Sequence, residues 1–142
     1  MVLGSVVAVG DINGDGTVDI LAAAKAGDGP ANAKDGAGEL HLIMGGASIV
    51  AGGSRDLSTN PAPYLYGVDI NDGLPSGLAV GDLSQDGTAD MLIGVTGGSG
   101  PANNRIGAGE VYAVYGRATW TTAAVNTVAN TVIYGRRGSD TL

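Results

Sequence analysis

Short apolar stretches separated by glycine, proline, asparagine and aspartate make up most of this chain. Eight of them, each four to seven residues long, lie at residues 6–10, 18–24, 39–44, 64–67, 78–81, 89–95, 110–115 and 132–135. Short apolar runs bounded by turn residues predict β-strands. Several runs are continuous rather than alternating, which favours sheets covered on both faces. We expect no helix beyond one turn within residues 48–52 and one turn within residues 120–128.

The stretches belong to an internal repeat. Residues 5–45 align with residues 76–116 at a constant offset of 71, without a gap, and 20 of these 41 positions are identical. The sequence YLYG at 64–67 then matches VIYG at 132–135. The chain is therefore divided into two units, 1–75 and 76–142, of four strands each. Four-stranded units in tandem are typical of β-propeller blades, so the sequence predicts an all-β fold with two blades of four antiparallel strands.

Between the first two predicted strands of each unit lies an acidic segment of nine residues. These segments, loop 1 (residues 11–19) and loop 2 (residues 82–90), hold six of the 14 acidic residues of the chain. Oxygen-bearing side chains occupy positions 1, 3, 5 and 9, and the residue at position 7 would add its backbone carbonyl. Ca²⁺ takes six to eight oxygen ligands, and such a loop can curl around it. The candidate ligands are Asp11, Asn13, Asp15, Thr17 and Asp19 in loop 1, and Asp82, Ser84, Asp86, Thr88 and Asp90 in loop 2.

Two other structures also have acidic loops of this kind. Asp, Asn and Gly are also favoured in hairpin turns that bind no ion. An EF-hand requires a bidentate Glu at position 12 and flanking helices. Position 12 is Ala22 in the first unit and Ile93 in the second, both inside predicted strands, so an EF-hand is excluded. Gly16 and Gly87 at position 6 permit the sharp turn that a calcium loop needs.

The order of strand, DxNxDGxxD loop and strand resembles the FG-GAP repeat of integrin α-subunits and of bacterial surface proteins. The sequence GAGEVYAVYG at 107–116 also resembles the third strand of that repeat. The resemblance implies a β-propeller with Ca²⁺ held between the first two strands of each blade by the residues named above.

Charge and composition narrow the function. The net charge of −7 disfavours nucleic acid and anionic membranes as partners. No apolar run is long enough to span a bilayer. The single histidine, His41, aligns with Tyr112 within a strand, so no nucleophile–base pair stands out and an enzyme is not expected. We expect a calcium-binding scaffold for interaction, outside the cell or at its surface, whose export signal is not present in this chain. A lectin-like, carbohydrate-binding propeller and a fragment of a larger adhesion protein are the alternatives.

Two blades cannot close a propeller by themselves, because propellers usually have four to eight. The sequence therefore predicts self-association into a ring, as a trimer with six blades or a tetramer with eight. Protein or glycan ligands are expected at the variable segments 46–63 and 117–130. Trp120 in the second of these is either an exposed contact residue or a packing residue.

Overall fold

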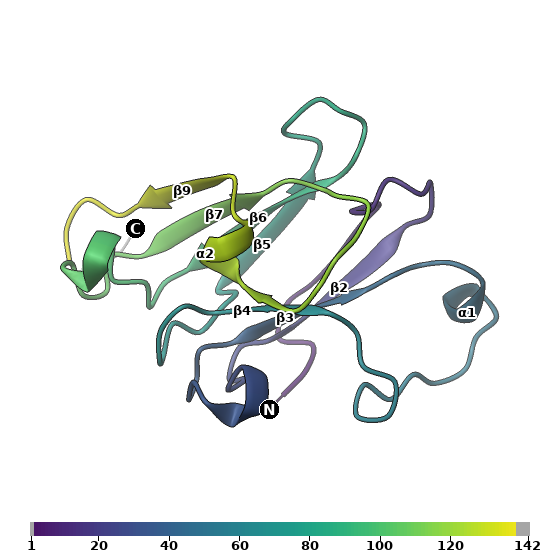
Figure 1. The fold of residues 1–142 in the computed structure, drawn as a ribbon, viewed down its shortest axis with the longest axis horizontal. Helices are drawn as coiled ribbons and strands as arrows, with labels where there is room; N and C mark the ends of the chain where they lie inside the picture. The colour runs from purple at the N-terminus through teal and green to yellow at the C-terminus, as the bar shows by residue number, and fades with distance from the viewer. Residues whose placement is uncertain (1, 139–142) are drawn as a thin grey trace.

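The computed structural model describes residues 2–138, and within them the chain is almost entirely β-structure (Figure 1). The nine strands are β1 (Val7–Gly10), β2 (Asp19–Ala24), β3 (Glu39–Ile43), β4 (Tyr64–Tyr66), β5 (Gly77–Gly81), β6 (Asp90–Val95), β7 (Glu110–Val114), β8 (Ala123–Ala124) and β9 (Thr131–Tyr134). Single helical turns occur at α1 (Ala47–Val50) and α2 (Val125–Val128), with 3₁₀ turns at Pro30–Asn32 and Pro101–Asn103.

The strands form two sheets that follow the internal repeat. The first blade has the order β1-β2-β3-β4 and the second the order β5-β6-β7-β9, and all these neighbours are antiparallel. The predicted all-β fold with two four-stranded blades is confirmed. The eight predicted strands coincide with these eight to within two residues at either end, because each is an apolar run ended by turn residues.

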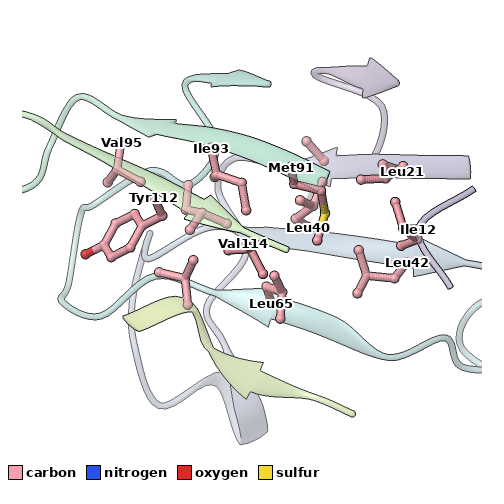
Figure 2. Close-up of a cluster of buried hydrophobic side chains, with 13 residues drawn as sticks. Ile12, Leu21, Leu40, Leu42, Leu65, Met91, Ile93, Val95, Tyr112 and Val114 are labelled. Carbon is pink, nitrogen blue, oxygen red and sulfur yellow. The ribbon is translucent and has the colours of Figure 1, made fainter. Parts of the chain in front are cut away.

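The hydrophobic core lies between the two sheets (Figure 2). Leu21, Leu40, Leu42 and Leu65 project from the first blade and are fully buried. They meet a row of apolar side chains from the second blade, which consists of Met91, Ile93, Val95, Tyr112 and Val114. Since only one face of each sheet takes part, each blade contributes half of a face-to-face interface.

The segment at residues 117–130, which we call the strap, leaves the second blade and crosses to the first (Figure 1). Its strand β8 pairs in parallel with β4, with Leu65 opposite Ala123, so the first sheet has a fifth strand. Val125 at the start of α2 is fully buried in the core. The two repeats are thus joined by strand pairing as well as by side-chain packing.

Candidate metal-binding loops

Loop 1 connects β1 to β2, and loop 2 connects β5 to β6. Both pairs are antiparallel hairpins, so each loop lies at the same end of its blade. The two loops also touch, because the Ala89 amide donates to the Asp11 carbonyl at 2.9 Å. The fold therefore places the ten predicted ligands in two neighbouring loops at one end of the molecule.

The first carboxylate of loop 1 organises the turn. Asp11 Oδ1 accepts hydrogen bonds from the amides of Gly14 (2.7 Å) and Asp15 (3.1 Å), and Asp11 Oδ2 accepts one from Gly16 (2.8 Å). These bonds curl the chain around Asp11. A side chain that accepts hydrogen bonds from amides two to five residues ahead is the usual device of an Asp-rich turn.

The middle of loop 1 is a small polar network. Asp15 Oδ2 accepts from Asn13 Nδ2 at 2.8 Å, and Asp15 Oδ1 accepts from the Thr17 amide at 2.7 Å. The Asn13 side-chain bond first, and the Thr17 amide second, lower the pKa of Asp15 below its ordinary value. Asp15 is fully ionised at neutral pH, as a cation ligand must be.

The last carboxylate ties loop 1 to the sheet. Asp19 is fully buried, and its two oxygens accept from the amides of Ile12 (2.9 Å) and Gly45 (2.8 Å). Ile12 is the second residue of the loop, and Gly45 follows β3. Asp19 therefore fixes both the loop and the end of the third strand.

Loop 2 repeats the main hydrogen bonds of this arrangement. Asp82 accepts from the amides of Asp86 (3.1 Å) and Gly87 (3.0 Å), and Asp86 accepts from the Thr88 amide at 2.8 Å. Asp90 accepts from three amides, those of Leu83 (2.8 Å), Ser84 (2.7 Å) and Gly116 (2.8 Å). The same nine-residue pattern thus folds in the same way in both blades.

The pKa of Asp90 shows which effect dominates at this position. Burial raises the pKa, but the amides of Gly116, Ser84 and Leu83 stabilise the carboxylate and hold its pKa below the ordinary value. Asp90 is consequently ionised at neutral pH although its side chain is buried.

The glycines at position 6 have the conformation that the sequence predicted. Gly16 and Gly87 have φ of +83° and +87°, a region that side chains rarely enter. Position 4 is left-handed as well, with φ of +74° at Gly14 and +60° at Gln85. Loop 2 therefore holds a glutamine where loop 1 has the residue best suited to the turn.

The chemistry of the donor set fits a hard cation such as Ca²⁺. Each carboxylate oxygen can accept two hydrogen bonds, and most of the loop carboxylate oxygens accept only one, from an amide, so a lone pair is left for a cation. In loop 2, Ser84 Oγ is buried and has no hydrogen-bond partner among the described residues. However, within residues 2–138 no three Asp, Glu or His side chains stand in a group that could hold a metal ion. Calcium binding thus requires the loop side chains to close around the ion.

Loop 1 is covered by the strap, which the sequence did not predict. The Ile12 carbonyl accepts from the Arg117 amide at 3.0 Å and from Trp120 Nε1 at 3.1 Å, and the Arg117 guanidinium lies 4.9 Å from the centre of the Trp120 ring. Trp120 is therefore a packing residue, the second of the two predicted roles. Its indole N–H, a donor that needs a partner when buried, was the available signal.

The other titratable candidates occupy packing positions. His41 is buried in β3, with Nε2 3.1 Å from Glu39 Oε2 and its ring 5.2 Å from that of Tyr64. At the equivalent place in β7, Tyr112 donates to Glu110. Glu39 and Glu110 recur at one position of the repeat and pair with a neighbour in the same strand, which is a structural role.

Comparison with known families agrees with this geometry. Residues 3–43 match the family described as FG-GAP repeat, and the matched segment contains β1, loop 1, β2 and β3. No curated protein matches the chain. Among the described residues, no helix is long and apolar enough to cross a membrane. The resemblance predicted from the sequence is confirmed, and FG-GAP repeats are propeller-type modules for structure and interaction.

Proposed function

We propose that this FG-GAP chain is a calcium-stabilised β-propeller module that acts as a non-enzymatic scaffold for protein interaction outside the cell or at its surface. The observation that carries the proposal is the recurrence of one loop in both blades. Each loop places oxygen side chains at positions 1, 3, 5 and 9, and in each the carboxylates at positions 1, 5 and 9 accept hydrogen bonds from amides at corresponding positions.

Calcium is favoured over magnesium by the number and flexibility of the donors. Four side-chain oxygens and one carbonyl in a glycine-containing loop suit the larger and less demanding ion, whereas Mg²⁺ requires near-octahedral geometry and retains several waters. Three carboxylates in one loop repel one another, and a divalent ion removes that repulsion. Two such ions, each of charge +2, would change the formal net charge from −7 to about −3.

An extracellular place suits loops of this kind. Calcium is present there at millimolar concentration, which fills sites with dissociation constants of about 10⁻⁴ to 10⁻³ M. FG-GAP repeats occur mainly in extracellular and surface proteins. Within the described residues, the segment 51–61 is exposed apart from Leu57 and carries Arg55 and Asp56, so it is the better of the two predicted interaction segments. The strap, in contrast, packs on the first blade.

The test is calorimetric titration of the chain with Ca²⁺ and with Mg²⁺, together with thermal unfolding in calcium and in chelator. Two calcium sites are expected, with a melting temperature that rises with calcium concentration. A ligand at 100 times its dissociation constant adds about 2.7 kcal/mol per site.

The matched variants are a double substitution, Asp11→Asn with Asp82→Asn, and a control, Asp56→Asn, which neutralises an exposed carboxylate outside the loops. The double variant should lose the calcium response and the control should keep it. Equal melting temperatures in calcium and chelator, with no heat of binding, would overturn the proposal.

A further inference from the structure

Each blade leaves one face of its sheet outside the core. On the second blade this open face carries Ala79, Leu92, Val111, Ala113 and Ile133, none of which is buried, and Ile133 is 58% exposed. On the first blade the open face carries Val7 and Val9 in β1, which are 66% and 62% exposed. The open face of the second blade is apolar, whereas the open face of the first blade is apolar along β1 and carries the buried Glu39 and His41 in β3.

The repeat relates each open face to a buried one. Residues 71 positions apart are equivalent in the two blades. The core-facing residues of the first blade therefore have equivalents on the open face of the second blade: Ala8, Leu21, Leu40 and Leu42 correspond to Ala79, Leu92, Val111 and Ala113. In the other direction, the exposed Val7 and Val9 of the first blade correspond to Leu78 and Val80 of the second blade, which pack against the core. The two open faces are thus the repeat equivalents of the two surfaces that already pack together inside the chain.

One close contact inside the chain shows how specific that packing is. A Cβ built on Gly10 would lie 2.5 Å from Cγ1 of Val80 and 3.2 Å from Cβ of Ala89, so only glycine fits at this position. The repeat equivalents are Gly81 and Val9. Among the described residues, no atom beyond the chain neighbours of Gly81 lies within 4 Å of its Cβ position, and Val9 is mostly exposed to solvent. The second blade therefore has the same recess, and the first blade has the same side chain to fill it.

The backbone repeats this relation. Inside the chain the Ala89 amide donates to the Asp11 carbonyl. The equivalent donor and acceptor are the amide of Val18, a residue that is 58% exposed, and the carbonyl of Asp82. Leu83, the equivalent of the fully buried Ile12, is 48% exposed beside them. Among residues 2–138, apolar groups and a hydrogen-bonding pair thus remain without partners at matching places.

We propose that a second copy of this chain docks head to tail on the open face of the second blade, with its Val9 packed over Gly81. The contact reproduces the interface between the two blades of one chain. Because the two surfaces differ, the contact is heterologous, and repetition closes a ring of three or four copies. The inference depends on the packing of the blades and not on calcium in the loops.

The first test is the mass of the chain in solution, measured by light scattering in calcium buffer. We expect three or four times 13.9 kDa; a monomer or a dimer would contradict the ring. Gly81→Val adds a strand-favouring side chain whose Cβ meets no described side chain or backbone beyond its chain neighbours, and which occupies the place of Val9, so this variant should be a monomer with unchanged far-ultraviolet circular dichroism. Ala33→Leu, at an exposed loop position outside both faces, is the control and should assemble as the wild type does.

A second test uses the absence of cysteine from the sequence. Inside the chain the Cβ position of Gly10 is 3.7 Å from Cβ of Val80, within the range that a disulfide needs. Gly10→Cys with Val80→Cys should therefore form a disulfide within one chain, which is the positive control. A mixture of Val9→Cys and Gly81→Cys chains should form disulfide-linked pairs, whereas neither variant should do so alone.

Three results would overturn the proposal. They are a wild-type chain that stays a monomer of 13.9 kDa, a Gly81→Val variant that assembles as the wild type does, and a mixture that forms no mixed disulfide while the control forms its own. Crosslinking of Val9→Cys alone would indicate a symmetric contact instead and would also overturn it.

Discussion

Loop 1 and loop 2 have the same local fold but different surroundings. In loop 1 the second residue, Ile12, is fully buried, and its carbonyl accepts two hydrogen bonds from the strap. In loop 2 the equivalent residue, Leu83, is 48% exposed. The hydrogen bonds within each loop are set by nine residues of sequence, whereas the cover over a loop comes from the next blade. The difference shows that a loop of this kind is complete only when another blade follows it.

The largest expected difference between the two loops is the loss of stability when the apolar side chain at loop position 2 is removed. Ile12→Ala should lower the free energy of unfolding by about 3 kcal/mol, because it opens a cavity in the core. Leu83→Ala should cost no more than about 1 kcal/mol, since half of the side chain is already in water. Both are to be measured by urea unfolding in the Gly81→Val background, so that association does not contribute. Equal losses in the free energy of unfolding would mean that the neighbouring blade covers both loops to the same extent.

The second prediction concerns the strap. Trp120→Phe keeps an aromatic ring but removes the indole donor to the Ile12 carbonyl and weakens the contact with the Arg117 guanidinium. We expect a loss of about 1–2 kcal/mol in urea unfolding. Tyr134→Phe, which removes a hydroxyl from an exposed ring in β9, is the control. If Trp120→Phe and Tyr134→Phe lower the free energy of unfolding equally, the strap does not stabilise loop 1.

The third prediction concerns calcium affinity. Loop 1 has an amide at position 3, glycine at position 4 and the strap above it, so it should bind calcium roughly tenfold more tightly, about 1.4 kcal/mol. Trp120 is the single tryptophan of the sequence and contacts loop 1, so its fluorescence should report that site. Asp11→Asn should abolish the fluorescence change and Asp82→Asn should preserve it. The reverse outcome would assign the tighter site to loop 2.

The smallest expected effect concerns position 4. Gln85 has φ of +60°, which is costly for a residue with a side chain, so Gln85→Gly should stabilise the chain by about 0.5–1 kcal/mol. Gly14→Ala should destabilise the chain by about 1 kcal/mol. Residue 14 has a φ of +74°, which is unfavourable for alanine, and the new Cβ would lie 3.2 Å from Thr88 Oγ1. Thermal unfolding in chelator measures both. Two changes of the same sign would show that backbone strain does not distinguish the loops.

The sequence predicted the parts of the fold that depend on local patterns. The strands, the two units and the turns at Gly16 and Gly87 follow from apolar runs and from glycines at fixed offsets. The predicted ligands do lie in two loops that share their main hydrogen bonds. Their binding of calcium is still a prediction.

What the sequence could not give is the arrangement of the strap. Strand β8 has only two residues, too few for any periodic pattern, and it pairs with β4 of the other repeat rather than with its neighbours in sequence. The burial of Val125 and the two hydrogen bonds to Ile12 depend on the same long-range pairing. Such contacts are decided by packing between blades, which local sequence does not encode.

The pairing of β8 with β4 also sets a sequence of events during synthesis. The first blade leaves the ribosome with the outer edge of β4 unpaired, and residues 123–124 emerge only after nearly the whole second blade. An unpaired edge is a site where strands from other chains can add, and domains generally fold from the N-terminus as they are made. The nascent first blade is therefore the stage at which this protein is most open to aggregation, and slowing translation beyond residue 75 would prolong it.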